Sequence, residues 1–335
     1  MKKGFTLIEL LAVIVILAII ALIAVPRVMD AIDDARKGAF ENQEHSVIKA
    51  AENYLVSNKN VIPNNIGEGI QVDIEDLIDN SFLTGMDNNC EGYVVITSIG
   101  QNNFEYIPHV KCGEEPFSNI MPETGLVLDM PLGNNLDGGN FENKVNPSIY
   151  GININDVVAT EDRHAEMNAS YFNGDDSYIS LNTPQNLLND LSNITIMAWV
   201  KTTNSGHGRI VTLHRGSSAG SSLSLMERSG RLNYFLRDTG SYNDTGASIN
   251  SGDWTHVALT YNESTYKAYV NGVEVHRTDA GYSTLGSYAR NIGTYSGSTY
   301  TFEGDINEVR IYDRPLSEVE LRHVYELGLL TNEYR

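Results

Sequence analysis

Basic residues are scarce in this 335-residue chain. It has 23 lysines and arginines against 43 aspartates and glutamates, which gives a formal net charge of −20. The apolar stretch near the N-terminus carries almost none of this charge, so the rest of the chain is strongly acidic. This composition argues against direct nucleic-acid binding, which needs basic patches to contact phosphates. It is compatible with solubility outside the cell and with binding of cations such as calcium, although solvation alone also explains it.

Cysteine is almost absent as well. Only Cys90 and Cys112 are present, and a structural zinc ion needs four nitrogen or sulfur ligands close together. These two cysteines would have to recruit distant histidines, so we exclude a zinc site. An even cysteine count in an exported chain favours one disulfide, and two free buried thiols are the alternative.

The stretch from Phe5 to Val25 lacks glycine, proline and every charge except Glu9. A helix of that length spans roughly 30 Å at about 1.5 Å per residue, the thickness of a bilayer's hydrocarbon core. We therefore predict a transmembrane helix over residues 5–25. A plain signal anchor or a cleaved secretory signal explains neither the very short leader, 1–4, nor the carboxylate. An ionisable group at membrane depth is costly and needs a partner, which a free amino group at Phe5 would supply.

Residues 3–10, Lys-Gly-Phe-Thr-Leu-Ile-Glu-Leu, resemble the processing site of type IV prepilins and their type II secretion relatives. The resemblance implies that a prepilin peptidase cleaves between Gly4 and Phe5 and that Phe5 is then N-methylated. It also implies that the mature helix waits in the cytoplasmic or inner membrane and then enters the core of an extracellular filament of pilin subunits. Glu9, with Phe5, would guide that assembly.

After Pro26, which is expected to kink the helix, apolar residues recur at spacings of three and four, with charged residues between them. This period predicts that one long helix covers residues 5–57 and that its second half packs an apolar stripe on a small sheet. The charged side chains would face water.

Residues 58–118 are expected to form a small globular region. A short acidic helix is predicted over 72–79, and strands over 92–97 and 104–110 follow the pattern of a hairpin. Cys90 lies just before the first strand and Cys112 just after the second, so antiparallel pairing would bring them together as a disulfide. This order is similar to the globular part of pilins from Gram-positive bacteria.

A linker over residues 119–125 precedes a region rich in Gly, Asn, Ser, Thr and Tyr. Many short alternating strands there predict an all-β jelly-roll sandwich over 126–330, so the chain as a whole is expected to be α+β. The predicted strands are 125–130, 169–172, 178–181, 194–201, 209–213, 222–226, 231–236, 254–261, 266–270, 273–277 and 306–312.

Three local signals refine this prediction. Asn271-Gly272 is a strong hairpin turn signal between two alternating runs. The strand 194–200 is apolar on both faces and is expected at the centre of a sheet. Near the end, residues 317–320 form a capping box that opens a short helix, which Gly328 can close.

Five segments of this region resemble, in order and spacing, the laminin-G-like, concanavalin A-like lectin domains of bacterial surface proteins. They are 126–129, 171–179, 196–201, 254–261 with 269–272, and 304–312. The resemblance implies a fold but not a ligand, because function depends on the site rather than on the fold. Asn307 departs from relatives, which often have Asp at this position.

An enzyme must be considered, because glycoside hydrolases share this sandwich. They need two carboxylates about 5 to 9 Å apart, which alternate positions of one strand would supply. No Glu-x-Asp-x-Glu run lies on a predicted strand, so we expect no enzyme and no catalytic residues. Trp199 and Trp254 fit packing positions better than sugar platforms, and His256 is expected to be a strand histidine with satisfied hydrogen bonds.

The candidate binding residues are polar. His207, Arg209, His214 and Arg215 could form a polar rim near one pair of loops, although a solvated surface is the simpler explanation. The sequence itself does not assign the ligand-binding residues.

Calcium is the one metal that the sequence favours, because it takes six to eight oxygen ligands. Asp129, Asn173, Asp175 and Asp305 are the candidate ligands. An Asx turn at Asn173, with hydrogen-bonded aspartates, is the alternative.

Three functions follow from these patterns. The first is an adhesive filament subunit whose sandwich binds a glycan or a surface protein. The second is a structural pilin, or a type II secretion or competence-like pseudopilin, whose sandwich has no ligand. The third is a hydrolase displayed on the cell surface, against which the missing carboxylate pair counts.

Overall fold

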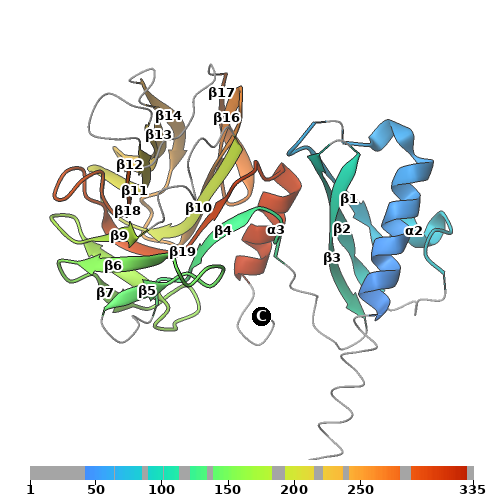
Figure 1. Ribbon diagram of the computed structural model, residues 1–335, viewed down its shortest axis with the longest axis horizontal. Coiled ribbons are helices and arrows are strands. Elements are labelled where there is room, and N and C mark those ends of the chain that lie inside the picture. The colour runs from blue at the N-terminus through green and yellow to red at the C-terminus, as the bar shows by residue number, and fades with distance from the viewer. Residues whose placement is uncertain are drawn as a thin grey trace, which may run out of the picture.

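The structure is a computed structural model that describes residues 42–63, 65–84, 90–100, 102–112, 121–133, 139–182, 193–214, 222–236, 241–279 and 288–329. Helix 42–57, a small sheet, helix α3 and a large β-sandwich follow one another along the long axis of Figure 1. The predicted membrane-spanning half of the long helix lies outside these residues. No helix within the described ranges is both long and apolar enough to cross a membrane.

Within the described residues, the small unit is a three-stranded sheet, called sheet A, with helix 42–57 on one face. Helix 42–57 ends where predicted, and both the backbone and the side-chain amide of Asn58 donate to the carbonyl of Tyr54 at 2.9 Å. Its apolar stripe packs on sheet A, as the 3.6-residue period predicts. The buried contact consists of Val47, Ala50, Ala51 and Leu55 of the helix with Val72, Val94, Ile96 and Val110 of the sheet.

Sheet A has the order β1-β2-β3, with β1 Gly69–Asp73, β2 Cys90–Gly100 and β3 Asn103–Cys112. The predicted hairpin is confirmed as β2 and β3. The acidic helix α2, Ile74–Asp79, begins two residues later than predicted, and strand β1 was not predicted. The reason is that β1 buries only Val72 and runs directly into α2, so no turn residue separates the two patterns.

In the part of the chain that the structure describes, the sandwich consists of two eight-stranded antiparallel sheets, and the predicted all-β sandwich is confirmed. Sheet B has the order β17-β16-β15-β10-β19-β8-β7, and β4 also pairs with β19. Its strands are β4 Leu126–Met130, β7 Val158–Thr160, β8 Ala169–Asn173, β10 Asn193–Lys201, β15 Thr255–Asn262, β16 Thr265–Val270, β17 Val273–Asp279 and β19 Glu303–Tyr312.

Sheet C has the order β14-β13-β12-β11-β18-β9-β6-β5. Its strands are β5 Asn140–Glu142, β6 Tyr150–Ile154, β9 Tyr178–Asn182, β11 His207–His214, β12 Ser222–Arg228, β13 Arg231–Leu236, β14 Ser241–Ser248 and β18 Tyr288–Ile292. The strands that the sequence did not predict, β5, β6, β7, β14 and β18, are short or polar, so they lack the apolar alternation used to find strands.

The core lies between the two sheets and contains alternate residues of each strand. In β10, Ile194, Ile196, Ala198 and Val200 face this core, and the intervening side chains point to the opposite face. The whole of 194–200 is buried, and β10 lies between β15 and β19, so its predicted central position is confirmed. The predicted hairpin turn is also confirmed, with φ values of 50° at Asn271 and 76° at Gly272.

Helix α3, Glu318–Leu329, packs on the face of sheet B that points away from the core. Its predicted capping box is confirmed, because the amide of Ser317 donates to Glu320 Oε2 at 2.7 Å and the amide of Glu320 donates to Ser317 Oγ at 3.2 Å. Gly328, however, lies within the helix and does not close it. A Cβ at Gly328 would lie 2.6 Å from the Trp199 ring, so this glycine permits close packing.

The other side of α3 contacts sheet A. Thr97 Oγ1 lies 3.0 Å from Ser317 Oγ, and the hydroxyl of Tyr93 donates to Glu326 Oε2 at 2.7 Å. Sheet A therefore lies between helix 42–57 and α3, and α3 joins sheet A to the sandwich (Figure 1).

Candidate functional site

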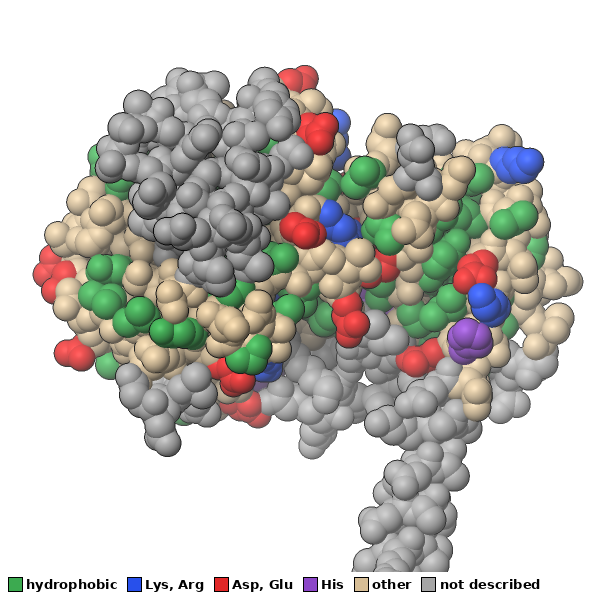
Figure 2. All heavy atoms as spheres, viewed as in Figure 1, with side chains coloured by type: hydrophobic (Ala, Val, Ile, Leu, Met, Phe, Trp, Pro, Cys, Tyr) green, Lys and Arg blue, Asp and Glu red, His purple; other side chains and the backbone are tan. Residues whose placement is uncertain are grey.

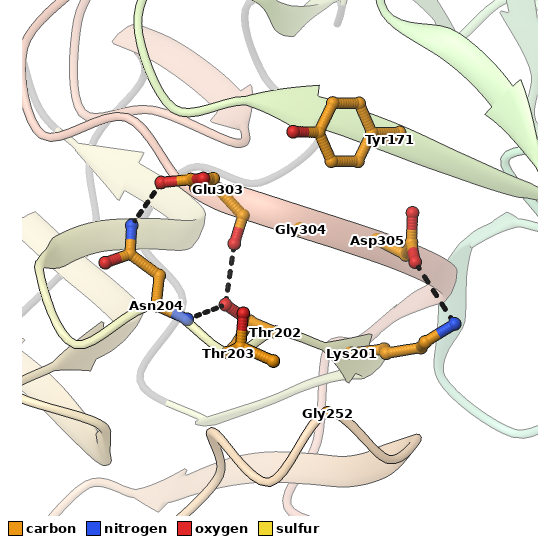
Figure 3. A pocket seen from close by; sticks show the side chains of 9 residues that line it. All are labelled: Tyr171, Lys201, Thr202, Thr203, Asn204, Gly252, Glu303, Gly304 and Asp305. Atoms are coloured by element: carbon orange, nitrogen blue, oxygen red, sulfur yellow. Dashed lines mark hydrogen bonds and ion pairs between the residues drawn. The ribbon is translucent and has the colours of Figure 1, made fainter.

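A cleft of about 220 Å³ lies on the outward face of sheet B. It is lined by Tyr171, Lys201, Thr202, Thr203, Asn204, Gly252, Glu303, Gly304 and Asp305 (Figure 3). We call it the β8–β10–β19 cleft, after the strands that supply most of it.

The strand register creates the floor of this cleft. Asp305 of β19 lies opposite Tyr171 of β8 on one side and opposite Lys201 of β10 on the other. Residues directly opposite in an antiparallel sheet share a face, so these three side chains form one row. Lys201 is two residues after Trp199, which α3 covers, so the cleft lies next to α3 on the same face.

A network of hydrogen bonds holds the loop that follows β10. Thr202 Oγ1 donates to the carbonyl of Glu303 at 2.7 Å and accepts from the amide of Asn204 at 2.9 Å. Asn204 Nδ2 then donates to Glu303 Oε2 at 2.8 Å. The carbonyl group of Asn204 and the second oxygen of Glu303 are thereby fixed in orientation, as a binding site requires.

The charged pair in the cleft is loosely held. Lys201 Nζ lies 3.7 Å from Asp305 Oδ2, and both groups remain partly accessible. Burial raises the pKa of Asp305, and Lys201 lowers it in part. The Lys201 ammonium also lies 6.0 Å from the centre of the Trp254 ring. The Tyr171 side chain is 38% exposed, so its ring is open to a ligand.

Gly304 explains the shape of the cleft. Its φ is +137°, and a Cβ there would collide with the carbonyl oxygen of Lys201. Only glycine permits this approach of the two strands. Gly304 is also the reason why the start of β19 was predicted at Ile306, although the strand begins at Glu303.

The expectation that no strand carries two carboxylates at alternate positions is wrong, because β19 begins earlier than predicted. Glu303 and Asp305 do occupy alternate positions of one strand in the cleft. Each carboxylate, however, has its own partner. Figure 3 shows Glu303 directed toward Asn204 and Asp305 directed toward Lys201. A pair of carboxylates therefore exists in the cleft, and its position is suited to hydrogen bonding.

The predicted calcium ligands do not converge on one point. Asp129 Oδ1 lies 2.9 Å from Arg310 Nε, and Arg310 is five positions from Asp305 along β19. That separation is roughly 16 Å at strand geometry, whereas two ligands of one calcium ion lie within about 5 Å of each other. No cluster of three or more His, Cys, Asp or Glu placed to hold a metal occurs in the described ranges.

At the turn after β8 the structure shows the Asx arrangement. Asn173 Oδ1 accepts hydrogen bonds from the amides of Asp175, Asp176 and Ser177 at 2.9 to 3.1 Å. Asn173 also lies opposite Glu303, beside the cleft. Calcium binding stays a prediction.

The predicted tryptophan roles are correct for one residue and only partly so for the other. Trp199 is 1% exposed and stacks on Tyr325 of α3, with ring centres 5.6 Å apart. Trp254 is half-buried just before β15 and borders the charged pair of the cleft. The expectation for His256 is wrong, because its buried Nδ1 has no hydrogen-bond partner among the described residues.

Neither the polar rim nor the solvated surface that the sequence allowed describes Arg209. Arg209 is 1% exposed and is surrounded by aromatic rings, and His207 lies beside it. The side chain of His214 and the whole of Arg215 lie outside the described residues. The sequence carried no signal for Tyr171, Asn204 or Glu303, because only the strand register brings them together.

The remaining predicted residues concern the N-terminal unit. Strands β2 and β3 pair with Cys90 directly opposite Cys112, the register that the predicted disulfide requires. The bond stays a prediction. Gly4, Phe5 and Glu9 lie outside the described residues.

Comparison with known families agrees with this division of the chain. Residues 1–25 match the prokaryotic N-terminal methylation motif, and residues 173–322 match the Concanavalin A-like lectin/glucanases superfamily through its laminin-G model. The chain joins a type IV prepilin signal to a laminin-G-like domain. A search of curated proteins finds no match.

Several solved structures are similar to this pilin-like, laminin-G-like chain over 60% of its length. The binding domain of Paraclostridial Mosquitocidal Protein 1 is 15% identical, with a TM-score of 0.47 over 52% of that chain. Domain 4 of AbnA, a GH43 extracellular arabinanase from Geobacillus stearothermophilus in complex with arabinotriose, is 20% identical, with a TM-score of 0.46 over all of that chain.

The receptor binding domain of botulinum neurotoxin D is 16% identical, with a TM-score of 0.46 over 52% of that chain. The present chain thus spans about half the length of the mosquitocidal and neurotoxin domains.

Proposed function

We propose that this protein is a type IV pilin-like filament subunit whose sandwich binds a carbohydrate in the β8–β10–β19 cleft. The prepilin signal and the lectin-like domain support the two halves of this proposal. In this proposal the precursor is processed in the membrane by a prepilin peptidase. It then joins other pilin subunits in an extracellular filament and presents the cleft for adhesion.

The cleft chemistry supports a neutral, hydroxyl-rich ligand. Carboxylates of Glu303 and Asp305 accept hydrogen bonds, and the ammonium group of Lys201 donates them. The exposed Tyr171 ring offers a flat apolar surface beside these polar groups, and a sugar ring presents both hydroxyls and an apolar face. The single observation that carries the proposal is the row Tyr171–Asp305–Lys201 created by the register of three strands.

A binding site explains the cleft better than a catalytic one. A hydrolase needs one free carboxylic acid and one carboxylate aimed at the same bond. Here Glu303 accepts from Asn204 and Asp305 pairs with Lys201, so the two carboxylates are engaged separately. We therefore propose a non-enzymatic protein.

The test is a glycan array probed with the full chain in detergent and with intact filaments. We expect retention of a subset of neutral glycans. Tyr171→Ala and Asn204→Ala should each weaken it about tenfold, since a stacked ring or a positioned polar group contributes on the order of 1 kcal/mol or more. Tyr171→Phe should retain most binding.

Val273→Ala is the matched control, because Val273 lies on edge strand β17 and its side chain is 56% exposed. Absence of glycan retention by wild-type filaments would favour the structural alternative, in which the sandwich has no ligand. Release of reducing sugar from a retained glycan would favour the hydrolase.

Calcium can be tested in the same array. A calcium site beside the cleft would use Asn173, Asp175 and Asp305, without Asp129, which pairs with Arg310. Glycan retention that survives chelation with EDTA would show that calcium is not needed for adhesion.

A further inference from the structure

A second cluster of polar side chains lies on sheet C, on the face that points away from the core. Arg209 of β11 lies opposite Met226 of β12, and Arg209 Nη1 donates to Met226 Sδ at 2.9 Å. Arg209 is only 1% exposed, and its Nε has no hydrogen-bond partner among the described residues. A buried donor without a partner is costly and calls for an explanation.

Aromatic rings surround the Arg209 guanidinium. Its central carbon lies 4.8 Å from the centre of the Phe235 ring and 5.6 Å from the centres of Tyr242, Tyr295 and Tyr300. Burial lowers the pKa of Arg209, and the three tyrosines offset this in part. Within the described parts of the chain, no carboxylate forms an ion pair with Arg209. Aromatic faces attract a cation but do not neutralise it.

His207 adds a second buried nitrogen without a partner among the described residues. It is two residues before Arg209 on β11 and so shares its face. Its ring lies 4.3 Å from the Tyr300 ring, and its buried Nε2 has no partner in the described ranges. Burial, followed by the positive charges of Arg209 and Arg228, lowers the pKa of His207 to about 4, so the ring is neutral near pH 7.

The charge balance of this cluster is positive, in contrast to the chain as a whole. Arg228 is exposed, and its guanidinium lies 4.4 Å from the centre of the Tyr242 ring. Glu227 points to the opposite face of β12 from Met226 and accepts from the amide of Gly230 at 2.6 Å. Asp244 pairs with Arg231 at 3.2 Å. The amide of Gly246, then Arg231 and Arg228, lower the pKa of the Asp244 carboxyl, so Asp244 offsets Arg228 in part. Neither carboxylate forms an ion pair with Arg209.

We propose that His207, Arg209 and Arg228 bind the carboxylate of an acidic sugar. A carboxylate would neutralise the excess positive charge and accept hydrogen bonds from Arg209 Nε and His207 Nε2. The rings of Tyr242 and Tyr300, which are 37% and 43% exposed, would stack on the sugar. A small inorganic anion has no ring that could stack on these tyrosines. The tyrosines therefore favour an anionic group that is carried on a sugar ring.

This site extends the proposed function but does not depend on the cleft. The two lie on different sheets, and the segment 300–305 connects them, with Tyr300 at the cluster and Glu303 and Asp305 in the cleft. An acidic sugar at the cluster and a neutral sugar at the cleft would be contacted by separate side chains. The two sites can therefore be removed independently.

The experiment is titration of the full chain in detergent with methyl glucuronide, methyl glucoside and inorganic phosphate, followed by calorimetry or saturation-transfer NMR. We expect the glucuronide to bind at least tenfold more tightly than the glucoside, and more weakly as salt increases. Arg228→Gln and His207→Gln should each reduce glucuronide affinity about tenfold. Arg322→Gln is the matched control and should have no effect, because Arg322 is exposed on α3 and is paired with Glu318.

Four outcomes would overturn the site. The first is equal affinity for glucuronide and glucoside. The second is phosphate binding as tight as glucuronide binding, which would indicate a simple anion site. The third is glucuronide affinity that Arg228→Gln and His207→Gln leave intact, which would make Arg209 a packing residue held by its rings. If Tyr171→Ala alone abolished glucuronide binding, the sugar would belong to the cleft, which would overturn this site and leave the proposed function intact.

Discussion

Single buried polar residues explain how α3 is attached to sheet B. The Arg163 guanidinium donates to the carbonyl of Gly328, to Asn307 Oδ1 at 2.8 Å and to Glu308 Oε1 at 2.8 Å. It also lies 4.4 Å from the centre of the Trp199 ring. A cation at the C-terminal end of a helix stabilises the unpaired carbonyls there. Asn307 is therefore a structural residue, and its side-chain amide donates to the carbonyl of Pro131 at 2.9 Å, which an Asp could not do when ionised.

Gly328→Ala tests the close packing of α3 on Trp199. The added Cβ would lie 2.6 Å from the Trp199 ring, so the helix or the ring must shift. We expect a loss of about 1 to 3 kcal/mol in the free energy of unfolding, measured by urea titration. Gly100→Ala is the control, since its Cβ would meet only Asn103 at 3.9 Å. Equal effects of the two substitutions would contradict this account of Gly328.

The buried His256 side chain is expected to make the free energy of unfolding depend on pH. It is 1% exposed, and burial, followed by the charge of Arg310, lowers its pKa to about 3 from the model-compound value of 6.5. Below pH 6.5 the unfolded chain binds this proton and the folded chain does not, so the free energy of unfolding falls as the pH decreases toward 3. For this group alone the fall is about 3 kcal/mol at pH 4.

His256→Gln should flatten this decline between pH 7 and pH 4, measured by urea unfolding at both values. The exposed His45→Gln is the control and should leave the decline as it is. A variant that loses stability at pH 4 as steeply as wild type would show that His256 does not contribute.

At the scale of elements, α3 belongs to two units at once. Its N-terminal end is tied to sheet A by Arg314, which pairs with Glu105 of β3 and lies 2.6 Å from Glu320 of α3. Its body packs on sheet B through Leu321 and Val324. The sandwich predicted over 126–330 thus includes a helix whose second face is covered by sheet A.

Arg314→Met tests this connection. Glu320 is fully buried, and the substitution would leave its carboxylate without its cation. Breaking a buried ion pair on one side typically costs about 3 to 5 kcal/mol. We expect a loss of that size in urea unfolding. Arg322→Met is the control, because Arg322 pairs with Glu318 on the surface, where an ion pair contributes less than about 1 kcal/mol.

The β2–β3 hairpin predicts a disulfide between Cys90 and Cys112. The register places the two residues opposite each other, and the bond would close a loop of about 22 residues. Such a loop contributes roughly 3 kcal/mol in the chain-entropy model. The double substitution of both cysteines by serine should lower stability by that amount, and reductant should destabilise wild type but not the variant. Alkylation of both thiols in native, non-reduced protein would contradict the bond.

At the scale of the whole molecule, helix 42–57, sheet A, α3 and sheet B pack on one another in that order. Helix 42–57 covers one face of sheet A, α3 covers the other, and sheet B packs on α3 (Figure 1). Figure 2 shows apolar, acidic and basic side chains interspersed on the visible face of the described residues. In a filament that holds the N-terminal helix, this packing would carry the sandwich, with its cleft, as a fixed extension of helix 42–57 and sheet A.

Glu9 is expected to matter only for assembly. A carboxylate among apolar residues costs a few kcal/mol on membrane insertion, and the amino group of a processed Phe5, which stays positive after methylation, would offset its charge in the filament. Glu9→Ala should therefore leave synthesis and cleavage after Gly4 intact but reduce incorporation into filaments. Glu9→Gln should be milder and still defective.

Immunoblots of sheared surface fractions measure this effect. Wild-type incorporation of Glu9→Ala would show that the carboxylate does not guide assembly. Retention of Met1 in surface filaments, seen by mass spectrometry, would contradict the processing step itself.

The sequence by itself determined the local patterns of this protein. The N-terminal motif around Gly4 and Phe5 and the capping box before α3 each depend on neighbours in the chain, and so does the turn at Asn271-Gly272. The sandwich was also predictable, because alternating apolar strands have few stable arrangements. The same local patterns predicted that Gly328 ends a helix. A glycine that ends a helix cannot be distinguished in sequence from one that permits close packing, as Gly328 does against Trp199.

Only the tertiary structure decided the candidate sites. Tyr171, Lys201 and Asp305 lie in three strands far apart in the chain, and the register of those strands sets them in one row. Arg209 was predicted on a polar rim, yet it is buried among rings from three other segments. The physical reason is that strand pairing and burial are long-range properties, whereas a sequence pattern reports only on residues a few positions apart.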